Sequence, residues 1–215
     1  MASGLVLSVN VGRPTELRTP KRVVLSSIVK HPISGPVTAR GVNLEGDEQA
    51  DKANHGDFSK AVYAYAREDA AWWEEVIGRP LAYAAFGENL STSKIDLTQA
   101  RIGDRWRIGT VELQVTGPRI PCYKLAAVMD DPGFVRRFAQ AGRPGAYLSI
   151  AREGKLRAGD RIEVVSRPEH GVTVGMVANA TLLDPARLPA LEPARGDFTP
   201  QLAAWVASRT PTSQL

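Results

Sequence analysis

The sequence has very little cysteine: Cys122 is the only one in 215 residues. A single cysteine cannot form an internal disulfide, so we expect a fold that needs no oxidising compartment, a reduced thiol and a cytoplasmic protein. The sequence also has no apolar run near the roughly 20 residues that a transmembrane helix needs. Its first residues, MASGLVLSVNVGRPTEL, show no basic segment followed by a long apolar one, so we expect neither an export signal nor a membrane anchor.

Several motifs that identify common enzyme sites are missing. Neither a CxxC pair nor HExxH occurs, which argues against a structural zinc site. Neither GxxxxGKS/T nor GxGxxG occurs, which argues against ordinary sites for ATP or dinucleotides, and GxSxG is absent too. There is no iron–sulfur cysteine set, flavin fingerprint or haem motif, so the sequence shows no point at which electrons would enter this chain alone.

The composition is that of a globular protein with a mild excess of basic residues. Hydrophobic residues make up 43% of the chain, enough for a core in one large domain or in a main domain with a small appendage. The net charge is +4 and the isoelectric point is about 9.4, but Lys and Arg are scattered among acidic residues. We therefore expect a small anionic ligand and no stable binding to nucleic acid.

The first part of the chain has the sequence pattern of β-strands. Apolar and polar residues alternate on both sides of Gly109-Thr110, so residues 104–116 are predicted to form a β-hairpin. Further short strands are predicted at 60–66, 146–151 and 161–165. Because such strands recur between turn signals, we predict a mainly β fold with helical insertions, built on a closed or nearly closed β-barrel.

Helix signals interrupt this pattern at 67–77, which stops at Gly78, and at 132–141, which Asp131-Pro132 opens. After residue 170 the character changes, and three short helices are predicted within 172–210. We therefore predict a β-barrel domain over residues 1–170 and a three-helix appendage over residues 171–215. The appendage is too short to hold a core alone, so it either docks on the barrel or packs against a partner.

The stretch PRIPCYKL, residues 118–125, surrounds the lone thiol with basic residues. If this stretch is extended, Cys122 and Lys124 share one face, and Arg119 reaches the same region from the preceding turn. Cations near a cysteine favour the thiolate, the form that binds metals and attacks electrophiles. Free cysteines are also common as small core residues, and these residues alone leave both interpretations open.

A polar stretch at 45–65 holds His55 and Lys60 and ends in a predicted strand. Loops at strand ends often present functional groups on a rigid scaffold, which makes both side chains candidates for a site. By composition alone, a solvated acidic loop closed by a glycine turn is the simpler interpretation.

The stretch FGENLSTS, residues 86–93, is a third candidate. Gly87 would let the backbone approach a ligand, and the side chains of Glu88 and Asn89 would orient one. The alternative is an ordinary turn in which Asn89 is hydrogen-bonded to its own backbone.

Several stretches in order carry a resemblance to a known family. The chain resembles the MOSC domain, the module named for the C-terminus of molybdenum cofactor sulfurases, over roughly residues 5–210. It looks most like the stand-alone bacterial YiiM-like subgroup, which adds a small three-helix domain after the barrel. The stretches are NVGR, LEGDEQAD followed by HG and KAVYAY, FGENL, IGDRWRIG followed by LQVTGPRIPCYKL, GAYLSI and AGD.

The resemblance implies a MOSC-type β-barrel and a molybdopterin-type molybdenum cofactor. It makes Cys122 the molybdenum ligand and, with His55, a catalytic residue. The chain reads His55-Gly56-Asp57 where His-Gly-Gly would be expected, which places a carboxylate beside the expected pocket. The residues that we assign to cofactor binding are Arg119, Lys124, Lys60, Gly87, Glu88 and Asn89.

We expect these residues to form one pocket. Cys122 would lie inside it near Arg119 and Lys124, which can pair with the cofactor's phosphate. His55 and Lys60 would form the opposite wall, and the side chains of Glu88 and Asn89 would lie at the rim.

The resemblance implies one of two functions. The first is a detoxifying oxidoreductase that reduces N-hydroxylated compounds of the hydroxylamino-purine type, with electrons from a separate reductase. The alternative is a carrier that delivers cofactor or sulfur without turnover of its own. In both cases the expected partner is a small molecule rather than nucleic acid or membrane, and the assembly state, including a homodimer, stays open.

Overall fold

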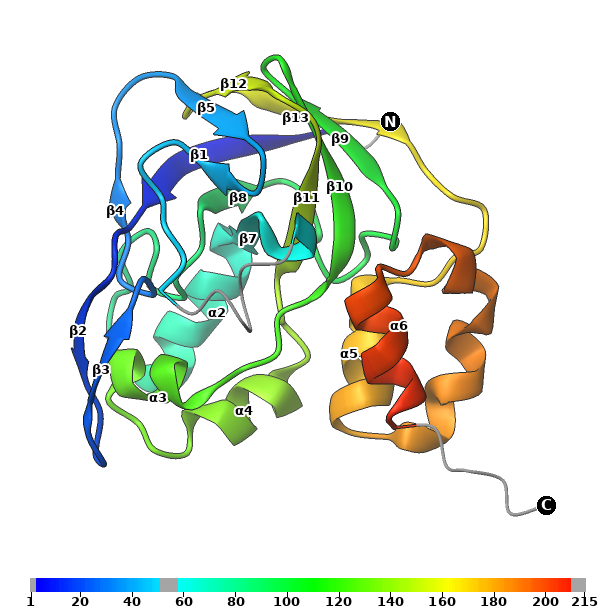
Figure 1. Ribbon diagram of the computed structural model, residues 1–215. Coiled ribbons are helices and arrows are strands. Elements are labelled where there is room, and N and C mark those ends of the chain that lie inside the picture. Colours follow the sequence, from blue (N-terminus) through cyan, green and yellow to red (C-terminus); the bar gives the residue numbers. More distant parts are fainter. Residues whose placement is uncertain (1–2, 51–57, 210–215) are drawn as a thin grey trace.

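The computed structural model describes residues 3–50 and 58–209 of the chain. Seven strands close into a barrel, in which β13 pairs with β1 to complete the ring (Figure 1). Neighbouring barrel strands are antiparallel, except that β7 and β8 run parallel. The predicted barrel is therefore confirmed. In ring order its strands are β13 (Arg161–Ser166), β9 (Arg105–Ile108), β10 (Val111–Pro118), β11 (Ala146–Arg152), β7 (Val62–Ala66), β8 (Leu90–Ser93) and β1 (Ser3–Val11).

Shorter strands decorate the barrel. The strand β4 (His31–Pro32) pairs with the end of β1. A small sheet forms from β5 (Val37–Arg40), β6 (Asn43–Leu44) and β12 (Gly154–Leu156). The strands β2 (Thr15–Arg18) and β3 (Val23–Ser26) form a hairpin that extends away from the barrel in Figure 1.

The strand β7 separates two hydrophobic clusters. Val62, Ala64 and Ala66 belong to the cluster that fills the barrel, whereas Tyr63 and Tyr65 belong to a second cluster outside it. Successive side chains of a strand point to opposite faces, so each cluster receives every second residue. This alternation directs Tyr63 toward the helices that flank the barrel.

Those helices are α2 (Arg67–Ile77), α3 (Tyr123–Met129) and α4 (Phe134–Ala141). The prediction of α2 is confirmed, including its stop at Gly78, which has φ 71°. The prediction of α4 is confirmed with a later start, because Asp131 accepts a hydrogen bond from the Gly133 amide in the turn before it. Of residues 122–124 only Cys122 is extended, since α3 begins at Tyr123, so the shared strand face considered for Cys122 and Lys124 does not form.

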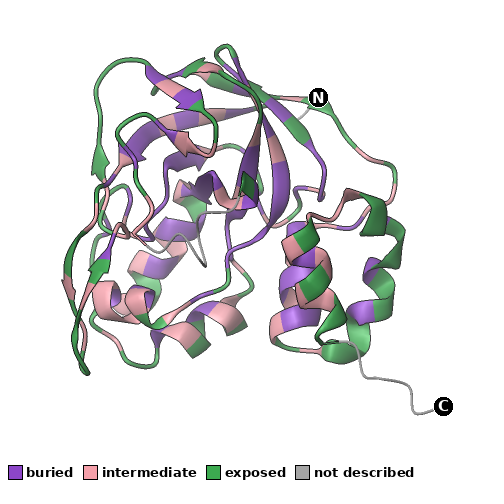
Figure 2. Ribbon diagram, in the orientation of Figure 1, coloured by how far each residue is buried: buried purple, intermediate pink, exposed green. Residues whose placement is uncertain are grey.

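Three helical segments follow the barrel: α5 (Val174–Leu182), the 3-10 helix η2 (Pro185–Asp197) and α6 (Pro200–Ala207). Side chains of these segments, among them Val177, Leu191 and Leu202, belong to the same hydrophobic cluster as the barrel interior. Figure 2 shows buried residues along the barrel strands and in α5. The appendage therefore docks on the barrel. Whether residues 1–170 and 171–215 fold as separate domains stays a prediction.

Across residues 3–50 and 58–209, no helix combines the length and the hydropathy that a transmembrane span requires.

Candidate functional site

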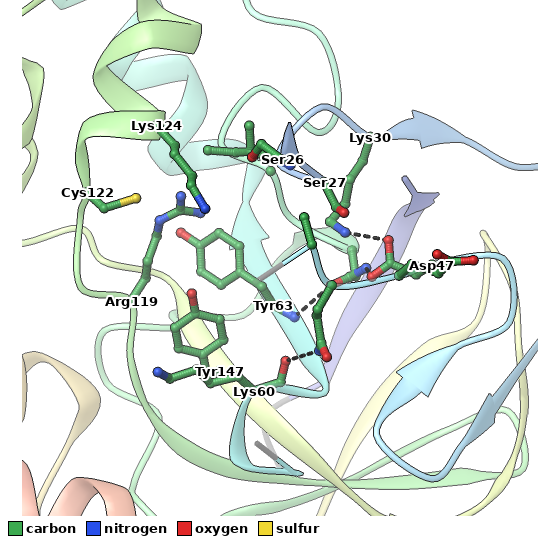
Figure 3. Close-up of a pocket in the computed structure, with 16 residues that line it drawn as sticks. Ser26, Ser27, Lys30, Asp47, Lys60, Tyr63, Arg119, Cys122, Lys124 and Tyr147 are labelled. Atoms are coloured by element: carbon green, nitrogen blue, oxygen red, sulfur yellow. Dashed lines mark hydrogen bonds and ion pairs between the residues drawn. The ribbon is translucent and has the colours of Figure 1, made fainter. Parts of the chain in front are cut away.

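A pocket lies where the segment before α3 passes the flanking loops of the barrel (Figure 3). Its cavity volume is about 100 Å³, or about 660 Å³ when the open space at its mouth is included. We call it the cysteine pocket. Its lining residues are Ser26, Ser27, Ile28, Lys30, Asp47, Glu48, Gln49, Ala50, Lys60, Tyr63, Gly87, Asn89, Arg119, Cys122, Lys124 and Tyr147.

The pocket brings together most of the residues that the sequence singled out. Cys122, Arg119, Lys124, Lys60, Gly87 and Asn89 all line it. The predicted catalytic residue His55 and the Asp57 carboxylate lie outside the described residues.

Cys122 is a half-buried residue at the entrance to α3. Its backbone is extended, with φ −133° and ψ 170°, and the helix begins at the next residue. Figure 3 shows the sulfur pointing toward the pocket centre. Lys124 reaches the same pocket from the first turn of α3, so the two residues meet through a helix turn and not along one face of a strand.

Arg119 is a buried cation, with 6% of the residue exposed. Its Nη1 donates a hydrogen bond to the Phe86 carbonyl oxygen, and its guanidinium lies 4.9 Å from the ring centroid of Tyr63. Within the described residues its Nε is buried without a hydrogen-bond partner, and no carboxylate forms an ion pair with it. A buried donor on a permanent cation is chemically suited to an anionic ligand.

Electrostatics keep the positive charge on Arg119. Burial acts to lower its pKa, but the phenols of Tyr147 and Tyr63 and the thiol of Cys122 outweigh burial, and the pKa is raised. These four groups therefore act on one another electrostatically inside one pocket.

Two tyrosines stand beside Arg119 in the middle of the pocket (Figure 3). Tyr63 on β7 and Tyr147 on β11 are directly paired residues of neighbouring strands, and their ring centroids are 5.2 Å apart. Burial raises the pKa of both phenols, while the positive charge of Arg119 opposes the shift. Both phenols therefore keep their protons at neutral pH. The Tyr63 hydroxyl donates its proton to the Pro144 carbonyl oxygen at 2.9 Å, so Tyr147 is the phenol that can donate a hydrogen bond to a ligand.

An ion pair between Lys30 and Asp47 forms the wall far from Cys122 (Figure 3). Asp47 also accepts hydrogen bonds from the Gly12 amide at 2.7 Å and from Asn89 Nδ2 at 2.9 Å. Burial lowers the pKa of Lys30, and the nearby Asp47 carboxylate opposes this shift. The Oδ1 atom of Asn89 accepts a hydrogen bond from the Tyr63 amide at 3.1 Å, so Asn89 joins this wall to β7.

The rim position expected for Glu88 and Asn89 is wrong, because both residues are buried. Glu88 does not line the pocket. Its carboxylate accepts hydrogen bonds from the amides of Ala84 at 2.8 Å and Phe86 at 3.0 Å and from Ser91 Oγ at 2.8 Å. Burial raises its pKa, and these hydrogen bonds oppose the shift. Glu88 therefore shapes the loop that carries Gly87.

Gly87 is required by its conformation and by a close neighbour. Its φ is +74°, and a Cβ there would lie 2.8 Å from Ile28 Cγ1 and 2.9 Å from the Ile28 carbonyl oxygen. The close backbone approach that the sequence suggested is thus to Ile28 of this chain.

Several lining residues were not predicted. Asp47, Tyr63 and Tyr147 lie within the stretches that carry the family resemblance, so those motifs contained the signal. Ser27 and Lys30 lie in no motif; the hydroxyl of Ser27 is buried without a partner among the described residues. Within those residues no three His, Cys, Asp or Glu side chains cluster as a metal site. A metal here would need further ligands from the molecule that carries it.

The chain resembles known proteins along most of its length. The family model of the MOSC domain matches residues 51–163. YflK of Bacillus subtilis is 37% identical over 187 residues, which cover 87% of this chain and 85% of YflK. A protein of Gibberella moniliformis named "Reductase" is 32% identical over 169 residues, which cover 77% of this chain and 30% of that protein. The crystal structure of YiiM from Geobacillus stearothermophilus superposes with a TM-score of 0.80 at 26% identity and covers 96% of this chain and 99% of that one. This chain belongs to the MOSC domain family.

Proposed function

We propose that the cysteine pocket binds a molybdenum cofactor of the molybdopterin type and that the chain reduces N-hydroxylated compounds of the hydroxylamino-purine class. MOSC domains are generally associated with this cofactor. The observation that carries the proposal is that Cys122 shares its pocket with Arg119, whose buried Nε has no partner among the described residues.

The pocket suits the two ends of such a cofactor. Arg119 has a donor to spare for a phosphate, since its buried Nε makes no hydrogen bond to the described part of the chain. The unpartnered Ser27 hydroxyl offers a further hydrogen bond in the same pocket. The thiolate of Cys122 is a soft donor of the kind that binds a molybdenum centre. One protein thiolate suffices if the cofactor brings the remaining ligands.

When bound, molybdenum supplies two-electron redox chemistry and accepts oxygen. The reduction consumes two electrons and two protons, breaks the N–O bond and releases water. Lys60 lies beside the pocket with its Nζ 6.0 Å from the ring centroid of Tyr147, where it can hold a proton close to the substrate. The protonated phenol of Tyr147 orients the polar group by donating a hydrogen bond, while the Tyr63 hydroxyl donates to the Pro144 carbonyl oxygen at 2.9 Å.

The electrons require a second protein in this proposal, because the sequence has no flavin, haem or iron–sulfur motif. The relative named a reductase supports this arrangement, since the part similar to this chain makes up only 30% of its length. We place the reaction in the cytoplasm, where a single thiol stays reduced.

The test is purification from a host that makes molybdenum cofactor, followed by elemental analysis and by assay of hydroxylaminopurine reduction with an artificial electron donor. Protein from a host that cannot make the cofactor is the matched control. Molybdenum near one atom per chain together with cofactor-dependent turnover supports the proposal. Transfer of intact cofactor to an apo-enzyme without turnover favours the carrier function instead, and protein that never retains molybdenum contradicts both.

A further inference from the structure

A second pocket lies on the other side of the segment that carries the lone cysteine. Arg119 and Cys122 line the cysteine pocket, whereas Pro118 and Ile120 line this second one. The residue Ile120 is 39% exposed and offers part of its apolar surface to this pocket. The segment thus forms a wall between two pockets.

The appendage builds the opposite side of this second pocket. Its lining residues from α6 are Gln201, Leu202 and Trp205. The Thr199 hydroxyl caps the N-terminus of this helix by accepting a hydrogen bond from the Leu202 amide at 3.2 Å. Trp205 is half-buried and packs partly against the main hydrophobic cluster. We call this space the tryptophan pocket.

The tryptophan pocket has the size and chemistry of a site for a small flat ring. Its cavity volume is about 200 Å³, or about 610 Å³ with the open space at its mouth, and the first figure lies below the roughly 300–1,000 Å³ of sites for drug-sized ligands. Trp205 and Ile120 offer apolar surfaces, and the Gln201 amide offers both a donor and an acceptor. Gly117 leaves its side open, since an added Cβ would meet only Leu202 Cδ2, at 3.9 Å.

The two pockets meet at shared residues. Lys60 and Tyr147 line both of them. A ring in the tryptophan pocket can therefore direct a substituent past Tyr147 toward the space that Cys122 lines.

We propose that the tryptophan pocket binds the flat heteroaromatic ring of the substrate, with Trp205 as a residue that determines specificity. The inference rests on the proposed function for the identity of the ring's substituent. Binding of the ring itself does not depend on the proposed function, because it needs neither cofactor nor turnover.

Two variants remove the site in different ways. Trp205→Ala deletes an aromatic wall, and Gly117→Val fills the pocket from β10 without removing any contact. Val206→Ala is the matched control, because Val206 lies next on α6 and packs against the core but does not line the pocket. Both pocket variants should weaken ring binding by about tenfold or more, whereas the control should leave it within about twofold.

The experiment titrates adenine, which cannot be reduced, into protein labelled with 5-fluorotryptophan and follows the four tryptophan signals by fluorine NMR. The Trp205 signal is identified by its loss in Trp205→Phe. It should shift at millimolar adenine while the signals of Trp72, Trp73 and Trp106 stay in place, and Gly117→Val should abolish the shift. In loaded enzyme, the same variant should raise KM for hydroxylaminopurine about tenfold and change kcat little.

A Trp205 signal that does not respond to adenine, or that responds equally in Gly117→Val, overturns the inference. Failure of the proposed function gives a different result: adenine would still shift the Trp205 signal, but the protein would retain no molybdenum or reduce no substrate.

Discussion

The guanidinium of Arg119 lies over the ring of Tyr63, 4.9 Å from its centroid, and donates a hydrogen bond to the Phe86 carbonyl oxygen. One buried side chain thus joins three stretches that are far apart in the sequence: the segment before α3, the strand β7 and the loop that holds Gly87. An isolated buried cation is costly, so its presence favours a site for an anion over a purely structural role.

Arg119→Met tests whether this cation serves binding rather than stability. The substitution removes a buried charge that has no carboxylate partner among the described residues and keeps much of the side-chain volume. The free energy of unfolding of the cofactor-free protein should equal that of the wild type or exceed it by up to about 2 kcal/mol. Cofactor retention should fall at least tenfold.

Arg119→Lys is the control, because it keeps the charge but loses the planar fork of donors. It should retain more cofactor than Arg119→Met and less than the wild type. If Arg119→Met lowers stability by more than about 2 kcal/mol and still retains cofactor, Arg119 is a structural residue. Chemical denaturation and elemental analysis of the same samples give both values.

Gly87→Ala should destabilise the protein because of both backbone strain and a collision with Ile28. Gly78→Ala separates the two effects, since Gly78 has nearly the same φ, +71°, and nothing within 4 Å of an added Cβ. We expect Gly78→Ala to cost about 1–2 kcal/mol and Gly87→Ala clearly more, with weaker cofactor binding as Ile28 is displaced. Equal losses of unfolding free energy in the two variants would show that Ile28 moves aside at no cost and would contradict the expected collision.

Glu88 should make stability depend on pH. Burial raises the pKa of this carboxyl above its ordinary value of 4.5, so the folded state binds its proton more tightly than the unfolded state. Its contribution to the free energy of unfolding is therefore greatest below about pH 4.5 and decreases as the pH rises through the folded-state pKa. Relative to Glu88→Gln, the wild type should lose stability over this range. Glu75→Gln, which removes an exposed carboxyl of α2, is the control for the loss of one negative charge.

The shared hydrophobic cluster predicts that barrel and appendage unfold together. Leu191 in η2 is 1% exposed within that cluster, so Leu191→Ala should lower the free energy of unfolding by about 2–5 kcal/mol. Leu183, which is 43% exposed, is the control, and Leu183→Ala should cost less than about 0.5 kcal/mol. Thermal unfolding should remain a single transition; two transitions in calorimetry would support an independent domain after residue 170.

The sequence predicted elements whose signals are local. The hairpin of β9 and β10 alternates cleanly, and α2 ends at a glycine, so both could be placed to within a few residues. The helix α3 was missed because it has only seven residues and because its N-cap residue, Cys122, makes no side-chain capping hydrogen bond. The strand β1 was missed because most of its residues are at least partly buried on both faces, which blurs the alternation.

In the site, too, the sequence predicted what local signals encode. Cys122, Arg119 and Lys124 stand together in the chain, so their common location could be expected. The ion pair of Lys30 with Asp47 depends on how two loops meet, which no local pattern encodes. Glu88 looked like a ligand-orienting group, yet its carboxylate is occupied by amides two and four residues before it, and only the folded loop reveals this.

The proposed molybdenum site depends on Cys122 as the metal ligand, and one variant separates this role from a structural one. Cys122→Ser removes the soft sulfur donor but nearly keeps the volume of a half-buried side chain. Elemental analysis and thermal unfolding of this variant, purified beside the wild type from a cofactor-competent host, should show molybdenum lost and cofactor-free stability within about 1 kcal/mol of the wild type. A Cys122→Ser protein that is destabilised by about 1–3 kcal/mol and still carries molybdenum at the wild-type level would contradict the account and make this thiol a core residue.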